Sequence, residues 1–388
     1  MKRVFILGWF SYPRGNATAN YVQYLAKALQ EEGYCVTVMS ALNSEFKLSD
    51  GDVIGGVIVR NIRWESKFSY IRRLMNGRLF PFVLAGKFAK LRLTSDDILI
   101  VPTSLPAIST LFQLKKKYKF KTIGYPLEWF GIEQYKTPRE ARKGEFQFQL
   151  NVKHDLLFPI SYHIREQFPK TPALVLPIMA DVTEFPLVPK EMDIYRFILP
   201  ANGMMKDALP EMLHGLALLT REELSRLEFH FTGVAENQIK SILNSFEYEK
   251  IKNSVILHDW MKYENLISLY QNMHFLLLAR DTTQMTLSNF PSKVPEVMTY
   301  GVIPVVSRVG DYTKYYLEDG VNSVFFEGCD ANSCAKAIRR AISFSKEEYI
   351  EISSKARECV ENKFDYHNWT KKIRLAIESM YIENSSYA

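Results

Sequence analysis

Two short runs of apolar residues in the last third of the chain constrain its fold most. Phe275–Ala279 and Ile303–Val306 are apolar throughout, and a polar loop and a short helical pattern separate them. Such runs are typical of parallel strands buried on both faces and joined by a helix. Arg280, Lys293 and Glu296 follow the first run, so they fall at a strand end and a helix start. An open α/β sheet binds its ligands at that edge.

The same alternation of strands and helices extends along the chain in two blocks, the second restarting near residue 196. Strands are predicted at 4–9, 35–39, 52–62, 98–102, 121–125 and 155–160 in the first block, and at 196–200, 227–233, 254–258, 275–280, 303–307 and 323–326 in the second. A chain of 388 residues is also too long for one ordinary α/β core. We therefore predict an α/β protein with two Rossmann-like, doubly wound sheets facing one another across a cleft. The expected domains are 1–182 and 183–365, followed by a C-terminal helix at 366–388.

Composition excludes several classes of protein. The chain is 47% hydrophobic and 24% charged, with a net charge of +6, and contains no apolar run of the roughly 20 residues that span a bilayer. Its first nine residues mimic a signal peptide but lead into no cleavage pattern, so a first strand is predicted there. The four cysteines lack CxxC spacing and the seven histidines form no HxH or HExxH pair. We therefore expect a cytosolic protein without a bound metal or other cofactor.

The segment 63–92 is both basic and aromatic. It contains eight Lys or Arg residues against the single acidic residue Glu65, interleaved with Trp64, Phe68, Tyr70, Phe80 and Phe82. This composition suits an anionic membrane surface or a lipid-linked substrate, which would place the protein at the inner face of the cell membrane. A pair of helices with a solvated basic face is the structural alternative. No nucleic-acid partner is expected, because no DNA- or RNA-reading motif accompanies the charge.

Two loops at corresponding places in the blocks are candidate ligand sites. Gly15 and Asn16 lie between the first strand and its helix, where backbone N–H groups could face a phosphate or a sugar, although any α/β protein needs a turn there. Asn202, Gly203 and Lys206 occupy the equivalent loop of the second block. A lysine there can reach a diphosphate with help from the helix dipole, and an ordinary surface lysine is the alternative.

Glu296 and the pair Asp50 and Asp52 each have a functional and a structural interpretation. Glu296 at the start of its predicted helix could accept hydrogen bonds from ribose hydroxyls, or could simply be stabilised by the helix dipole. Asp50-Gly51-Asp52 has the DxD pattern that holds a divalent ion in some sugar transferases, but its place between a polar loop and a strand favours an Asp-Gly turn. No metal ligand is therefore predicted.

With these residues in place, the chain resembles the GT-B fold glycosyltransferases, and specifically the retaining family 4 that builds bacterial capsule, exopolysaccharide and lipopolysaccharide chains. The resemblance is strongest over 275–320, where Phe290–Glu296 and Gly301–Val305 are similar to the donor motif of that family. It continues through Val309-Gly310-Asp311. Weaker similarities are found at Asp155–Ser161, at the hinge 177–185, and at Phe364 and Trp369, where the last helix of the family crosses back to the first domain.

The resemblance implies roles for individual residues. Glu296 matches the second glutamate of the E-x7-E motif, which binds ribose, and Lys206 matches the lysine that pairs with the diphosphate. The first motif glutamate is replaced by Ser288, and the usual arginine before Lys206 is absent, so Arg280 and Lys293 are expected to supply the missing charge. Further donor-binding positions are expected at Trp260, Met261, Ser292, Gly310 and Asp311.

The implied activity is a metal-independent, retaining hexosyltransferase. It would move a sugar from a UDP- or GDP-sugar bound to the second domain onto a saccharide or polyprenyl-linked acceptor bound to the first. Glu128 and Trp129 are candidate acceptor contacts, unless they are a buried aromatic residue and its paired acid. Two alternatives remain: a GT-B fold sugar-nucleotide epimerase, and a non-catalytic GT-B subunit that activates a partner, which Ser288 suggests.

Overall fold

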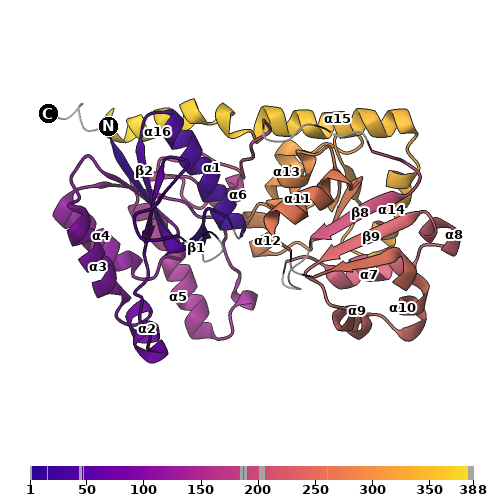
Figure 1. Ribbon diagram of the computed structural model, residues 1–388, viewed down its shortest axis with the longest axis horizontal. Coiled ribbons are helices and arrows are strands. Elements are labelled where there is room, and N and C mark those ends of the chain that lie inside the picture. The colour runs from indigo at the N-terminus through magenta and orange to yellow at the C-terminus, as the bar shows by residue number, and fades with distance from the viewer. Residues whose placement is uncertain are drawn as a thin grey trace. The chain divides into compact units, whose positions relative to one another are not determined.

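The computed structural model describes residues 2–14, 16–42, 46, 48–183, 187, 190–200, 206–259 and 261–382. The chain forms two compact units (Figure 1). Unit 1 comprises Met1–Met179 and Tyr366–Ala388, and unit 2 comprises Ala180–Asp365. The chain therefore changes unit at 179/180 and again at 365/366, where the sequence places the domain boundaries at 182/183 and 365/366.

Unit 1 contains a sheet with the strand order β3-β4-β2-β1-β5-β6-β7 in the described residues. The strands are β1 (Arg3–Tyr12), β2 (Cys35–Leu42), β3 (Val53–Ile54), β4 (Val57–Asn61), β5 (Ile98–Val101), β6 (Lys121–Gly124) and β7 (Leu156–Leu157). All neighbours are parallel except β3 and β4. The strand order reverses between β1 and β5, so the carboxyl ends of these two strands form a topological switch point.

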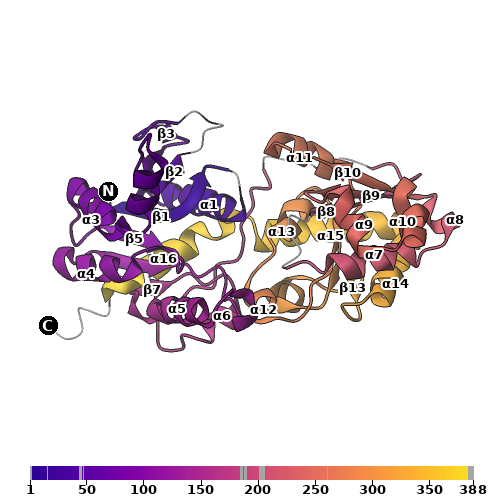
Figure 2. The ribbon, with the colours of Figure 1, turned by 90° about the horizontal axis from the view of Figure 1, so that it is seen from below.

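The helices of unit 1 are formed by sequence signals that are largely local. Asn16 caps α1 by accepting a hydrogen bond from the Ala19 amide at 2.9 Å, and Gly33 with φ +80° follows its end. The C-terminal helix α16 packs on α1 within unit 1 (Figures 1 and 2). The helices are α1 (Ala17–Glu31), α2 (Ser69–Asn76), α3 (Phe80–Leu91), α4 (Ile108–Tyr118), α5 (Pro138–Gln149), α6 (Tyr162–Arg165) and α16 (Thr370–Ile382), with 3-10 turns at Ile132–Gln134, Leu150–Lys153 and Tyr366–Asn368.

The segment 52–62, predicted as one strand, is instead the antiparallel hairpin β3–β4. Gly55 and Gly56 both have positive φ, at 52° and 80°, and they form the two-residue turn that such hairpins favour. The preceding Asp50 and Asp52 accept hydrogen bonds from the amides of Asn61 and Ser49, each at 2.7 Å. The DxD carboxylates therefore close a turn.

Unit 2 contains a parallel sheet with the order β10-β9-β8-β11-β12-β13 in the described residues. The strands are β8 (Tyr195–Pro200), β9 (Leu227–Thr232), β10 (Val255–His258), β11 (Phe275–Leu278), β12 (Ile303–Ser307) and β13 (Val324–Phe326). Its switch point lies between β8 and β11. Phe197 and Phe275, neighbours on these two strands, stack at 4.8 Å in a fully buried core.

Helices cover both faces of the unit 2 sheet. Figure 1 shows α11, α13 and α15 on one face, and α7, α9 and α10 on the other. The helices are α7 (Leu209–Ala217), α8 (Arg221–Leu224), α9 (Glu236–Ile242), α10 (Ser245–Ile251), α11 (Tyr263–Gln271), α12 (Gln284–Ser288), α13 (Lys293–Met298), α14 (Ala331–Ile342) and α15 (Lys346–Lys363), with a π-helical turn at Tyr312–Tyr316 and a 3-10 turn at Lys252–Ser254. The α/β fold class predicted from the sequence is thus confirmed.

Candidate donor site

The switch point of unit 2 brings together charged residues from three separate segments. Asp207 lies in the loop after β8, Arg280 follows β11, and Lys293 begins α13. Because β8 and β11 are parallel neighbours at the point where the strand order reverses, their carboxyl ends lie where open α/β sheets bind ligands. Glu296 lies one turn into α13, which begins at Lys293 and therefore earlier than predicted.

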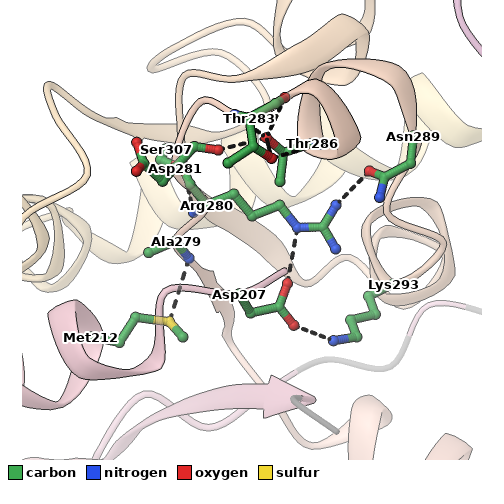
Figure 3. Close-up of polar contacts among 10 residues, drawn as sticks. All are labelled: Asp207, Met212, Ala279, Arg280, Asp281, Thr283, Thr286, Asn289, Lys293 and Ser307. Atoms are coloured by element: carbon green, nitrogen blue, oxygen red, sulfur yellow. Dashed lines mark hydrogen bonds and ion pairs between the residues drawn. The ribbon is translucent and has the colours of Figure 1, made fainter. Parts of the chain in front are cut away.

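A buried carboxylate joins the two cations (Figure 3). Asp207 accepts a hydrogen bond from Arg280 Nε on Oδ1 and one from Lys293 Nζ on Oδ2, each at 2.9 Å. The side chains of Asp207 and Arg280 are 4% and 5% exposed, whereas that of Lys293 is 19% exposed. Lys293 is therefore the member of the trio that solvent or a ligand reaches most easily.

Hydrogen bonds to its side chain and to its backbone fix the position of Arg280. Its Nη1 donates to Asn289 Oδ1 at 3.0 Å. Its backbone amide donates to Ser307 Oγ at 2.7 Å, and that hydroxyl donates back to the Arg280 carbonyl at 2.8 Å. These bonds connect β11 to β12 and to the loop after α12, so the guanidinium is held by the surrounding protein (Figure 3).

Two positive charges share one carboxylate here, so the cluster keeps a net positive charge. Burial by itself would raise the pKa of Asp207, but Lys293 and Arg280 outweigh that effect and hold the pKa below its usual value. Burial lowers the pKa of the Lys293 ammonium, and the Asp207 carboxylate offsets only part of this shift. The charge of the nearby Lys206 lowers the pKa of Lys293 further.

Glu296 lies on the side of α13 that approaches α11. Burial, and to a smaller degree the charge of Glu296, raises the pKa of the Tyr270 hydroxyl in α11. Glu296 is half-buried, and Met261 is half-buried just ahead of α11. The carboxylate thus lies near the helix that follows the segment predicted to face a nucleobase.

The loop after β12 requires a glycine. Gly310 has φ +71°, and a Cβ at this position would lie 2.9 Å from the Thr286 carbonyl oxygen. Asp311 beside it is buried, and Ser292 directly precedes α13. Ser288, which replaces the first motif glutamate, is fully buried and donates its hydroxyl to the Met285 carbonyl at 3.1 Å.

Sequence reasoning did not identify Asp207, Asn289 or Tyr312 as site residues. Asp207 and Arg280 are 73 positions apart, and only the pairing of β8 with β11 makes them neighbours. The Tyr312 hydroxyl is buried close to Asp207 and Arg280, with no hydrogen-bond partner among the described residues. The available sequence signal for Asp207 was its position next to Lys206. A charged residue that is buried in a loop requires a partner.

The structure places the residues predicted for the first domain in unit 1. Asn16 is the α1 cap described above. Trp129 follows β6, stacks on Phe148 with ring centroids 4.8 Å apart, and donates from Nε1 to Glu145 Oε2 at 3.0 Å. Glu128 is half-buried beside it. Gly15, Asn202, Gly203 and Trp260 lie outside the described residues.

The described residues contain neither a metal-binding cluster nor a membrane-spanning helix. No group of three or more His, Cys, Asp or Glu residues is arranged to hold a metal ion. Within the same ranges, every helix is too short or too polar to cross a membrane.

Comparisons with known proteins place the charged cluster inside a recognised domain. Residues 206–362 match the family described as glycosyl transferases group 1. No curated protein matches the sequence. The match begins at Lys206 and includes Asp207, Arg280, Lys293 and Glu296.

Several solved structures resemble the whole chain. Sucrose-phosphate synthase from Thermosynechococcus elongatus superposes with a TM-score of 0.73 at 12% identity, covering 99% of this chain and 100% of that one. The lipopolysaccharide outer core galactosyltransferase WaaB gives 0.65 at 18% identity, covering 98% and 99%. Anabaena HepE in complex with UDP-glucose gives 0.70 at 11%, covering 98% and 100%. The chain therefore has the GT-B fold, and residues 206–362 of its second unit match the glycosyl transferases group 1 family.

Proposed function

We propose that this protein is a glycosyltransferase that moves a sugar from a nucleotide-diphosphate sugar to a saccharide or lipid-linked saccharide acceptor. One observation carries the proposal: the net positive cluster of Arg280 and Lys293 around Asp207, with Lys206 near Lys293, lies at the switch point of the unit that contains the glycosyltransferase match. A parallel sheet binds its ligand at this edge, and the ligand that suits several cations is a diphosphate.

In the proposed mechanism, these cations stabilise the leaving group. Negative charge grows on the diphosphate as the bond to the sugar breaks, and a pre-positioned cation stabilises that charge without reorganisation. Lys293 and Lys206 would contact the diphosphate, with the more deeply buried Arg280 adding its field, and Glu296 would bind the ribose. A metal ion is not needed for this charge balance. Retention of configuration is proposed from the family resemblance, with departure and attack on one face of the sugar.

The donor and product classes are proposed from similar proteins. HepE was solved with UDP-glucose, a trehalose-6-phosphate synthase with UDP-2-fluoro-glucose, and WaaB is named for the lipopolysaccharide outer core. A UDP- or GDP-sugar donor and a role in bacterial surface polysaccharide synthesis fit these neighbours.

We also propose that unit 1 contacts an anionic membrane surface through α2 and its flanks. No residue of α2 is buried, and Phe68, Tyr70 and Phe82 are 71%, 75% and 73% exposed. Figure 1 shows α2 projecting from the rest of unit 1. Large exposed aromatic side chains among arginines are typical of interfacial segments that bind anionic lipids. This would hold the enzyme at the inner face of the membrane, next to a lipid-linked acceptor.

The decisive experiment incubates the purified chain with a panel of UDP- and GDP-sugars selected by thermal shift, because a bound ligand raises the unfolding temperature. Steady turnover, with product configuration read by NMR, supports a retaining transferase, and turnover should survive EDTA. Tight nucleotide binding without turnover would favour the non-catalytic subunit. Interconversion of nucleotide sugars would favour the epimerase, and a strict requirement for manganese or magnesium would exclude the metal-free mechanism.

A further inference from the structure

The carboxylate of Asp207 is an unusual feature for a site that binds anions. It is 4% exposed and lies between Arg280 and Lys293, two of the three cations that the proposed function places at the diphosphate. A buried ion cluster of this kind adds little stability compared with apolar side chains of similar volume. A negative charge would also repel a diphosphate. Its presence therefore suggests a role in the chemistry of its neighbours.

The two sides of the Asp207 carboxylate are not equivalent. Oδ1 binds Arg280, whose guanidinium and backbone are held by Asn289 and Ser307. This side is deeply buried and held in place by the surrounding protein. Oδ2 binds the ammonium of Lys293, which is more exposed and sits at the end of a flexible four-carbon chain. Arg280 therefore orients the carboxylate, and the carboxylate orients Lys293.

We propose that Asp207 is a positioning residue that holds the Lys293 ammonium charged and aimed into the donor site. The inference rests on the proposed function, because it gives Lys293 the diphosphate as its ligand. Arg280, which is itself held by Asn289, fixes the orientation of the carboxylate. Asp207 itself does not touch the donor.

The charged neighbours of Lys293 determine what the loss of Asp207 would do. Asp207 is the neighbour that favours the ammonium form of Lys293, whereas Arg280 and Lys206 oppose it and burial opposes it most. Glu296 lies one turn along the same helix, and the neutral Tyr312 hydroxyl is close to Asp207 and Arg280. Without the carboxylate, three cations would face one another. Lys293 would then lose its proton at a lower pH.

The test measures the affinity of UDP by calorimetry from about pH 7.5 to about pH 10, on the acidic side of the ordinary pKa of lysine and with the diphosphate ionised throughout. In the wild type, affinity should fall only toward the alkaline end. In Asp207→Asn the fall should begin at a lower pH than in the wild type. Lys293→Met should bind UDP about 10- to 100-fold more weakly at pH 7.5, the loss expected for one charged hydrogen bond.

Lys293→Arg is the matched control, because arginine stays charged throughout this range. Any fall in affinity that persists in this variant belongs to the nucleobase or to other groups. Asp207→Asn combined with Lys293→Arg should have the pH profile of Lys293→Arg alone. An equal loss at every pH, present in both the lysine and arginine backgrounds, would make Asp207 merely structural and overturn the inference.

Circular dichroism and thermal unfolding at both pH limits check the fold of each variant. If Asp207→Asn does not fold, Lys293→Arg alone must remove part of the alkaline fall in affinity, and an unchanged profile overturns the inference. Wild-type protein that binds neither UDP nor GDP overturns the proposed function as well, whereas normal binding with an unchanged Asp207→Asn profile overturns the inference only.

Discussion

Apart from the extra edge strand β3 in unit 1, the two units share a strand order, but they differ in the side chains at their switch points. In unit 2 the point between β8 and β11 holds the ion cluster of Asp207, Arg280 and Lys293. In unit 1, two tyrosines pack beside the point between β1 and β5. Tyr125 donates its hydroxyl to the Leu7 carbonyl at 2.6 Å and stacks on Tyr21 at 6.0 Å, and both rings are fully buried.

This difference shows how one topology can support two kinds of site. The switch point arises from the backbone alone, since it follows from the reversal of strand order. Its chemistry comes from the few side chains in the loops after the strands. A charged edge suits the diphosphate of a donor, and an edge backed by tyrosines suits a less charged ligand such as a saccharide. Four predictions test this difference between the two units.

The largest effect is expected from the unit 2 cluster. Lys293→Met should lower kcat about 10²- to 10³-fold while changing KM for the donor less, because the lysine acts most strongly on charge that develops in the transition state. Lys206→Ala should act in the same direction. Steady-state kinetics with the best donor measures both. The exposed Lys240→Ala on α9 is the control, and equal losses in the control and the site variants would contradict the assignment.

Unit 1 should carry the membrane contact. Replacing Arg72, Arg73 and Arg78 by glutamate removes about 1 kcal/mol of attraction per arginine. The affinity for anionic liposomes, measured by cosedimentation, should therefore fall at least about 100-fold. High salt should have the same effect on the wild type. Transfer to a soluble acceptor should be spared.

Changing the exposed Lys116, Lys117 and Lys119 on and after α4 to glutamate makes the matched control, because it alters net charge equally at another place on unit 1. If both triple variants lose liposome binding alike, the effect is one of total charge. Unaltered sedimentation of the arginine variant would leave α2 as a solvated helix.

Glu296 should affect binding more than chemistry. Glu296→Ala should weaken nucleotide binding by about 1–3 kcal/mol, the scale of losing hydrogen bonds to a charged acceptor. Calorimetry with UDP and GDP measures this, with the exposed Glu249→Ala on α10 as the control. An affinity equal to that of the wild type would remove Glu296 from the site.

The smallest effect concerns a buried histidine in each unit. Burial lowers the pKa of His154 in unit 1 to about 3 and that of His274 in unit 2 to about 4. The unfolded chain binds these protons near pH 6.5 while the fold does not, so stability is complete above about pH 6.5 and declines as the pH falls. Each histidine should lower the free energy of unfolding by about 1–2 kcal/mol between pH 7 and pH 5.

The two histidines differ in their partners, and this sharpens the test. His274 accepts from the Arg196 amide at 3.0 Å and bonds the Glu191 carbonyl at 2.7 Å, whereas neither ring nitrogen of His154 has a partner among the described residues. His154→Leu should therefore keep stability at pH 7 and reduce the loss at pH 5 in urea unfolding. The exposed His367→Gln should leave both unchanged. A His154→Leu protein as acid-sensitive as wild type would refute the assignment.

Much of the fold could be predicted because parallel strands buried on both faces appear as continuous apolar runs. Strands were predicted at 275–280 and 303–307, and the structure has β11 at Phe275–Leu278 and β12 at Ile303–Ser307. The hairpin β3–β4 was missed because Gly55-Gly56 interrupts only a short stretch of the predicted strand. The last helix was expected from the resemblance to return to the first domain, and α16 is part of unit 1.

The sequence by itself determined that the chain has two α/β units, that Lys206 lies in the loop after a strand, that Arg280 follows a strand and that Lys293 and Glu296 belong to the start of the next helix. These features are local, since they depend on hydrophobic runs and on the residues that follow them. Only the tertiary structure decided that Asp207 joins Arg280 to Lys293 and that Arg280 is buried. That decision depends on which strands pair, and strand pairing brings together residues that no local pattern connects.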